Sequence, residues 1–271
     1  MKYTIQNGRI QLTANSKGGE LWSLCRDSGD SRKEFLWCGN SQIWPRRAPV
    51  CFPWCGKLED NYFEEDNNRY QVPPHGFVRD LEHELADRTS SSLRFRVEWP
   101  GDGKLWPWRF SFETCHELTS GGVCSTFTVK NLDGRTMPFQ FGCHPGFAFP
   151  FSGAESPEHY AVRFLKAAPP YEERVILLRP ELFAQGRVLF ERERFSWIQL
   201  ESANSGTYVR LDTGDYPYTL LWSKPNLPGF LCIEAWTGIS GPTHQLRERP
   251  GTQLLLPGEQ VKFTQKITVS A

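Results

Sequence analysis

The sequence has no surplus of charge of either sign. Its 271 residues contain 31 lysines and arginines against 31 aspartates and glutamates, and the formal net charge at pH 7 is zero. A nucleic-acid-binding protein needs a basic surplus to displace counterions from phosphates, and a polybasic membrane segment or an acidic tail forms a block of like charge. Neither occurs, so we expect no nucleic-acid partner and no membrane partner.

Long apolar runs are also absent. No stretch approaches the roughly 18 apolar residues that span a bilayer. Residues 1–10 (MKYTIQNGRI) lack the apolar centre of a signal peptide, so we expect a cytoplasmic protein. Eight cysteines in a chain of this length are too dilute for a disulfide framework, which favours reduced thiols in the core.

Sequence motifs for metal ions and cofactors are lacking as well. Cys51 and Cys55 have the spacing CxxxC, with no second pair of Cys or His nearby to complete a zinc site. There is no glycine-rich phosphate loop and no cluster of ligand residues along the chain. The sequence thus predicts neither a metal nor a cofactor.

Aromatic residues and turn formers are abundant. Aromatics make up 14% of the residues, with 10 Trp, beside 23 Gly and 20 Pro. This combination is typical of short strands joined by frequent turns, and of ligand surfaces that use aromatic rings. There is no repeat, low-complexity tract or linker, so we expect one domain over residues 1–271.

An alternation of period two is the main secondary-structure signal. In residues 93–99 (LRFRVEW) every odd position is apolar and every even position is charged, as in a strand with one buried and one wet face. Similar alternation at 110–118 and 123–129 predicts an antiparallel meander. Residues 261–269 should form a closing strand, and residues 180–183 favour a short helical turn. The expected fold class is all-β, a large antiparallel β-sandwich.

Two histidines and one glutamate have unusual neighbours. His75 stands between two prolines and a glycine, where the backbone is extended and another chain or a ligand can come close. His144 belongs to an alternating segment that places it at a strand end on the polar side. Glu234 interrupts an apolar strand, where a buried charge costs of the order of several kcal/mol unless it is paired or protonated. Each could be an ordinary structural residue, but together they form a plausible acid–base site.

The sequence around these residues resembles the aldose 1-epimerase (galactose mutarotase-like) family, most closely its LacX-like branch. Four blocks carry the likeness across nearly the whole chain: 46–58 (RRAPVCFPWCGKL), 74–80 (PHGFVRD), 142–147 (GCHPGF) and 221–238, which contains LWSKP and CIEAWTG. The resemblance implies a β-sandwich of the galactose mutarotase type. It also implies an isomerase that interconverts the α and β anomers of a hexose, a small-molecule sugar.

The resemblance implies a role for each candidate catalytic residue. Glu234 would be the general base that takes the proton from the anomeric hydroxyl. His144 would protonate the ring oxygen as the C1–O5 bond opens, and His75 would hold or polarise that oxygen. We expect the two proton-transfer groups on opposite sides of the sugar, where general acid–base help is worth about 10²–10⁴ in rate.

Candidate substrate-binding residues come from the same blocks. Arg46, Arg47, Lys57 and Arg79 are expected near the pocket, unless they are solvated surface charges. Trp236 is two residues from Glu234, so both side chains should share one face of a strand. An indole beside the carboxyl group would offer a flat surface to a sugar ring.

Two alternatives to a free-aldose epimerase remain open at this level. A hexose-6-phosphate 1-epimerase would use the same arginines and lysine to hold the phosphate. A non-catalytic carbohydrate-binding module would stack its rings on the sugar and need no proton transfer. Lys57 stands where many relatives have Arg, and residues 182–190 contain no acid where relatives often place a sugar-binding Asp. The identity of the sugar, the pathway and the oligomeric state are therefore left open.

Overall fold

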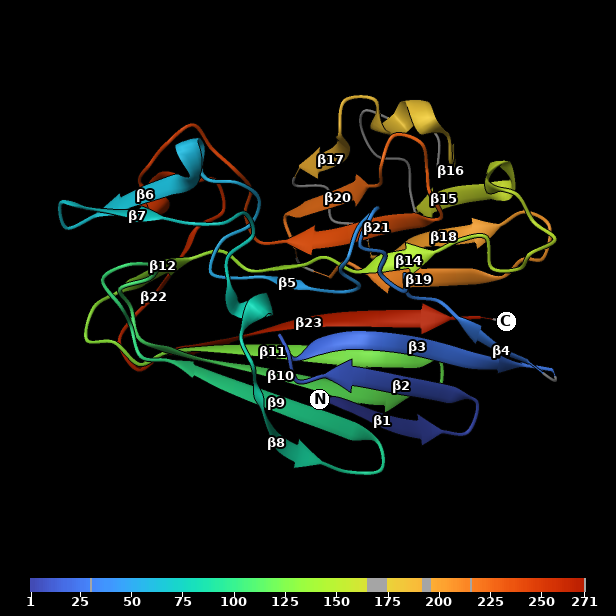
Figure 1. The fold of residues 1–271 in the computed structure, drawn as a ribbon, viewed down its shortest axis with the longest axis horizontal. Coiled ribbons are helices and arrows are strands. Elements are labelled where there is room, and N and C mark those ends of the chain that lie inside the picture. Colours follow the sequence, from blue (N-terminus) through green and yellow to red (C-terminus); the bar gives the residue numbers. More distant parts are fainter. Residues whose placement is uncertain (30, 165–174, 192–195, 215, 271) are drawn as a thin grey trace.

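The computed structural model describes residues 1–29, 31–164, 175–191, 196–214 and 216–270. Strands dominate these ranges, and the strands pair antiparallel with their neighbours (Figure 1). The all-β fold class that the alternating pattern predicts is confirmed. No helix in the described ranges has the length and apolarity needed to cross a membrane.

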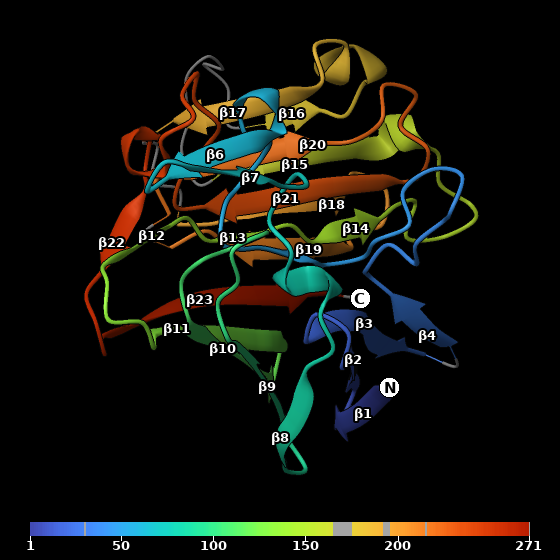
Figure 2. The same cartoon turned by 60° about the vertical axis from the view of Figure 1, so that its left-hand side comes forward.

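The largest sheet has nine strands in the order β16-β15-β18-β19-β23-β11-β10-β9-β8. Their bounds are β8 (Glu84–Arg88), β9 (Ser92–Trp99), β10 (Phe110–Thr119), β11 (Gly122–Asn131), β15 (Tyr160–Phe164), β16 (Val175–Leu177), β18 (Ile198–Ser202), β19 (Tyr208–Asp212) and β23 (Gln260–Val269). The meander β9-β10-β11 and the closing strand β23 are confirmed. In both views of the fold this sheet runs from β8 at the bottom to β15 and β16 near the top (Figure 2).

The alternation in the meander separates an inner face from an outer face. Phe95 and Phe112 are fully buried on the inner face. On the outer face Arg94 Nη1 and Glu113 Oε1 of neighbouring strands lie 2.8 Å apart in a partly exposed ion pair. The apolar residues of this pattern therefore build the core, as their spacing predicts.

A six-stranded sheet packs on that inner face. It has the order β17-β20-β21-β13-β5, with β14 also paired to β21. The bounds are β5 (Val50–Cys51), β13 (Gly142–Cys143), β14 (Gly146–Ala148), β17 (Arg187–Glu191), β20 (Tyr218–Trp222) and β21 (Phe230–Trp236). Next to β5, the ring of Phe52 lies 5.0 Å from Phe110 and 5.1 Å from Phe112 of the opposite sheet.

Smaller sheets complete the molecule. One has four strands, β1 (Lys2–Asn7), β2 (Ile10–Asn15), β3 (Glu20–Ser28) and β4 (Ser31–Glu34), and the others are the pairs β6 (Tyr62–Glu65) with β7 (Asn68–Gln71) and β12 (Met137–Phe139) with β22 (Gln253–Leu255). Short 3-10 turns lie at η1 (Glu59–Asn61), η2 (Val78–Asp80), η3 (Pro157–His159), η4 (Pro180–Phe183) and η5 (Leu246–Glu248). The turn η4 is the one that the sequence predicts.

The cysteines are free thiols. Five of the eight are buried, and Cys38 is exposed. All seven residues of strand β21 are buried. It is flanked by β20 on one edge and by β13 and β14 on the other.

Candidate active site

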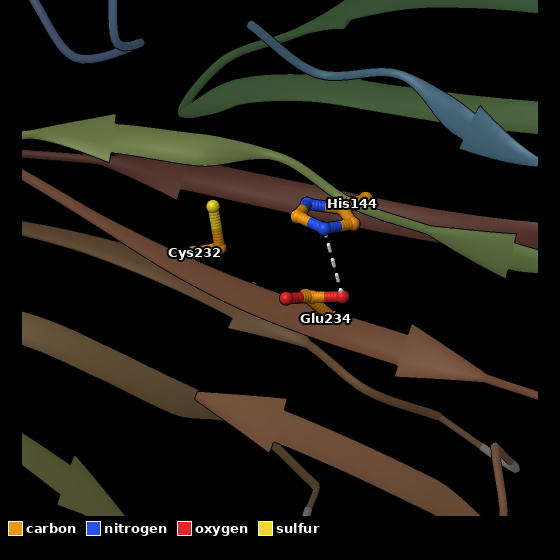
Figure 3. Close-up of side chains that lie close together, drawn as sticks. All are labelled: His144, Cys232 and Glu234. Atoms are coloured by element: carbon orange, nitrogen blue, oxygen red, sulfur yellow. Dashed lines mark ion pairs between the residues drawn. The ribbon is translucent and has the colours of Figure 1, made fainter. Parts of the chain in front are cut away.

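Strand β21 and the segment between β13 and β14 bring the candidate catalytic residues together. Cys232, Glu234 and Trp236 occupy alternate positions of β21 and therefore share one face. His144 lies where the chain leaves β13 and before it pairs again as β14, and its backbone N–H donates to Pro49 O at 3.0 Å. Figure 3 shows the imidazole of His144 facing the carboxyl group of Glu234.

The two groups are in direct reach of one another. His144 Nε2 lies 3.3 Å from Glu234 Oε2, and their side chains are 8% and 2% exposed. The sequence-based expectation of two groups on opposite sides of a sugar is therefore wrong, because no ring fits into 3.3 Å. Both groups instead line one shared cavity, on the same side of it.

The cavity measures about 450 Å³, within the range of small-molecule sites. Polar, aromatic and apolar side chains line it: Gly56, Lys57, His75, His144, Arg187, Leu220, Trp222, Glu234, Trp236, Ile239 and Ser240. A volume of this size accommodates a hexose together with water or a further small group. The three candidate catalytic residues, Lys57 and Trp236 thus line a single cavity.

Burial shifts both proton-transfer groups toward their neutral forms. Desolvation raises the pKa of Glu234 well above its usual value, with the charge of Cys51 acting in the same direction and that of Arg187 opposing it. Desolvation lowers the pKa of His144 well below its usual value, and the positive charge of Arg79 acts in the same direction. Burial therefore favours a protonated carboxyl group beside a neutral imidazole over the corresponding ion pair.

His75 presents a hydrogen-bond donor to the cavity. Its backbone has φ +65°, and its N–H donates to Gly56 O at 2.8 Å. Its Nδ1 accepts from the backbone N–H of Gly56 at 3.2 Å and lies 3.2 Å from Cys51 Sγ. Since Nδ1 is an acceptor, the proton of the neutral ring is on Nε2. Within the described ranges Nε2 has no hydrogen-bond partner, so it can donate to a ligand oxygen.

Aromatic rings hold His144 in place. Trp44 stacks on the imidazole with centroids 5.3 Å apart, and Trp222 meets it edge-on at 5.7 Å. Trp44 is fixed in turn by Phe230, which stacks on it at 5.2 Å. The ring of His75 also contacts His144 edge-on at 5.3 Å. These contacts limit the rotation of His144 and keep its Nε2 directed at Glu234.

The candidate binding residues separate into two groups. Lys57 and Trp236 line the cavity, whereas the three arginines make contacts outside its lining. Arg46 forms an ion pair with Asp80 at 3.0 Å, and Arg47 donates to Trp22 O at 2.8 Å and lies over its indole.

Arg79 is largely buried behind the loop that contains His75. Its Nη2 donates to Pro74 O at 2.6 Å, and its side chain is 11% exposed. The guanidinium therefore supports the backbone next to His75. Its charge acts on the site from a distance, as the shifted pKa of His144 indicates.

Sequence reasoning missed several residues of the site. Arg187 lines the cavity from the start of β17, within the very segment where an acid is lacking. Trp222 belongs to the LWSKP block, but the sequence does not distinguish it from the other tryptophans. Only the structure shows its position next to His144. Trp44 offers no signal in the sequence, because its contact with His144 depends on tertiary packing.

One group of potential metal ligands lies inside the site. The ligand atoms of His144, Cys232 and Glu234 are all within 4.8 Å of one another, and all three residues are buried (Figure 3). The sequence shows no ligand cluster because His144 is separated from the other two residues by more than eighty positions. Strand pairing between β14 and β21, which sets Gly146 opposite Cys232, brings them together.

Comparisons with known proteins agree with this architecture. The chain is 27% identical to the chromosomal protein LacX of Lactococcus lactis subsp. lactis over an alignment of 301 residues, covering 99% of both chains. A galactose mutarotase related enzyme from Lactobacillus acidophilus is 27% identical with a TM-score of 0.91, covering 100% of this chain and 98% of that one. A galactose mutarotase-like protein from Lactobacillus casei ATCC 334 has the same fold, with a TM-score of 0.90, 23% identity and full coverage of both chains.

The family model for aldose 1-epimerase matches residues 1–165, more than half of the chain. This region contains His75, His144 and the strands β13 and β14 on either side of His144. The chain therefore belongs to the aldose 1-epimerase family.

Proposed function

We propose that the protein is an aldose 1-epimerase that interconverts the α and β anomers of a hexose. The observation that carries this proposal is the contact of His144 Nε2 with Glu234 Oε2 at 3.3 Å on the wall of a cavity of about 450 Å³. Membership of the family and the shared fold support a sugar epimerase or mutarotase function.

The spacing of the two groups suits the reaction because both reacting oxygens are bonded to the same carbon. Ring opening takes a proton from the anomeric hydroxyl O1 and delivers one to the ring oxygen O5, while the C1–O5 bond breaks. O1 and O5 thus lie on one edge of the sugar, and that edge can face Glu234 and His144 together. The anomeric carbon becomes a carbonyl, and rotation about C1–C2 before reclosure gives the other anomer.

In this scheme the proton of the Glu234 carboxyl group first passes to His144 Nε2, 3.3 Å away. Glu234 as carboxylate then accepts the proton of O1, and His144 as imidazolium gives its proton to O5. Opening leaves a carboxyl group and a neutral imidazole, which is the arrangement that burial favours in the ligand-free site. Reclosure runs the same transfers backwards, so the pair has the same number of protons before and after the reaction. Such a pair serves both directions of a reaction whose substrate and product are nearly identical.

The remaining lining residues position the sugar. We assign the Nε2–H of His75 to the ring oxygen or a neighbouring hydroxyl, because this donor lacks a protein partner in the described structure. Trp236, whose indole N–H is buried without a partner among the described residues, lines the same cavity and meets His75 edge-on at 5.5 Å. Proximity and orientation of this kind add to the effect of proton transfer.

The proposal is tested by polarimetry from a pure anomer. A solution of α-glucose or α-galactose relaxes spontaneously, and the protein should increase the relaxation rate in proportion to its concentration. A non-catalytic sugar-binding module would leave the spontaneous rate unchanged, which would refute the proposal. The same assay over a panel of hexoses identifies the preferred sugar.

A hexose 6-phosphate is the second candidate substrate. Arg187 and Lys57 are exposed residues that line the cavity, and neither forms an ion pair with another described residue. Two cations in the lining of one cavity favour an anionic ligand. Saturation by glucose 6-phosphate at much lower concentration than by glucose would identify the phosphorylated sugar as the substrate.

A further inference from the structure

The trio of His144, Cys232 and Glu234 offers one nitrogen, one sulfur and one oxygen to a common point. Their ligand atoms lie within 4.8 Å of one another, and Nε2 and Oε2 are 3.3 Å apart. Glu234 Oε2 is buried without a hydrogen-bond partner in the described part of the chain. Mutarotation as proposed above uses the imidazole and the carboxyl group, but it leaves the thiol of Cys232 without a function.

One of these distances matches a tetrahedral zinc site. Zinc–ligand bonds of about 2.0–2.3 Å place neighbouring ligand atoms about 3.3–3.8 Å apart. The pair His144 and Glu234 already has this separation, and Cys232 Sγ lies within 4.8 Å of the ligand atoms of both. Three protein ligands with a fourth position open to a cavity is the arrangement in which zinc retains an exchangeable water.

The donor set selects among metal ions. A thiolate with an imidazole favours soft or borderline ions such as Zn²⁺ and Cd²⁺, whereas Mg²⁺ and Ca²⁺ prefer oxygen ligands. The site lacks one feature of resident zinc sites, because Nδ1 of His144 is buried with no hydrogen-bond partner among the described residues. Resident zinc ligands have their second ring nitrogen hydrogen-bonded, which orients the ring and strengthens binding. The trio therefore suits reversible capture of an ion better than permanent retention.

We propose that His144, Cys232 and Glu234 form a binding site for one zinc ion, and that zinc occupying it excludes the sugar. On binding, the thiol of Cys232 and the carboxyl group of Glu234 lose their protons to solvent, and both lone pairs go to the metal. The ion then holds the two atoms that face O1 and O5. The binding part of this proposal is independent of the proposed function, and the inhibitory part rests on it.

Binding is tested by titrating metal-free wild-type protein with CdCl₂ and recording the ultraviolet thiolate-to-cadmium absorption. We expect one Cd²⁺ per chain, displacement of the band by ZnCl₂ and no displacement by MgCl₂. Cys232→Ala should weaken binding by at least about tenfold, the smaller effect seen even when only a supporting residue of a metal site is lost. Cys232→Ser, which keeps the size of the side chain, provides a second variant, and circular dichroism verifies folding of both.

Two matched variants locate the site. Cys38→Ala removes an exposed thiol, and Cys51→Ala removes the thiol next to His75; both should retain the band. A band that survives both substitutions at Cys232, or that disappears in Cys51→Ala instead, would overturn the proposal.

The inhibitory part is measured separately. Zn²⁺ should raise KM for the sugar in the wild type without changing kcat, and this effect should be lost in Cys232→Ala measured against its own metal-free rate. Zinc that binds as expected and leaves KM unchanged would overturn the inhibitory part. If the wild type shows no mutarotation at all, the proposed function fails, and the cadmium band still decides the metal site.

Discussion

Replacing Gly142 by alanine should disturb the packing around the site and lower the activity of the protein. A Cβ atom at this position would lie 2.4 Å from Trp236 Cδ1 and 2.9 Å from Cys55 Sγ, whereas ordinary contacts begin at 3.4 Å. In Gly142→Ala the indole or strand β13 must therefore move by about 1 Å, and overpacking of this kind costs about 1–3 kcal/mol of unfolding free energy. Because His144 follows β13 and Trp236 lies on β21, the displacement falls inside the site.

A displacement of 1 Å in a catalytic arrangement can lower the rate about a hundredfold. We expect kcat/KM of Gly142→Ala in polarimetric mutarotation to fall by this order, while urea denaturation shows a loss of about 1–3 kcal/mol with a cooperative transition retained. Gly153→Ala is the matched control, since a Cβ there meets no atom within 4 Å. Wild-type kcat/KM in Gly142→Ala would refute the idea that close packing of β13 against Trp236 positions the site.

Three further predictions concern other residues of the fold and the site. His116 is buried, and desolvation lowers its pKa from 6.5 to about 4. This shift corresponds to about 3 kcal/mol of unfolding free energy, which is present above pH 6.5 and lost as the pH falls to 4. Urea titrations of His116→Gln should therefore show a smaller acid-induced loss of stability than the wild type, and an equal loss would contradict the assignment. His144→Asn should lower kcat more than it raises KM, and a change in KM alone would make His144 a binding residue. Arg187→Ala should lower kcat/KM for a hexose 6-phosphate about tenfold more than for the free hexose, which is the order of one charged hydrogen bond. Arg179→Ala, outside the cavity lining, is the control. Equal effects on both sugars would show that Arg187 does not recognise the phosphate.

The strands that the sequence predicts are those with one wet face. Residues 93–99, 123–129 and 261–269 alternate because the outer face of the nine-stranded sheet is exposed to water and its inner face is buried. In residues 110–118 the apolar positions face the core in the same way, but Ser111 and Cys115 on the outer face are buried as well. Strand β21 does not alternate, since it is buried on both faces and reads as an apolar run that only Glu234 interrupts. The order of the nine strands depends on pairings between distant segments, which local alternation does not encode.

In the candidate site, too, some residues can be found from the neighbouring sequence and others only from the folded structure. His75, His144 and Glu234 are identifiable from their flanking residues and line one cavity. Composition and spacing alone would not separate His144 from His116, a buried histidine whose ring is hydrogen-bonded to Ser125 and Gly19 in the core.

The positions of the arginines were not predictable from the sequence. Arg46 is held by Asp80 and Arg47 by Trp22, both distant in the chain, so their proximity in sequence to the pocket block did not place them in the lining. Arg187 enters the cavity because β17 pairs with β20 in the order that the fold imposes. Contacts of this kind follow from strand order, which only the folded structure specifies.

In the proposed reaction the carboxyl group of Glu234 exchanges a proton with the anomeric hydroxyl of a sugar. The most direct measurement is the mutarotation rate of Glu234→Gln from a pure anomer, with sugar binding followed in parallel by calorimetry. Because Gln keeps the shape of the side chain and cannot accept the proton, kcat should fall by about 10²–10⁴ while the sugar still binds. A variant that binds the sugar and mutarotates it at the wild-type rate would contradict this account.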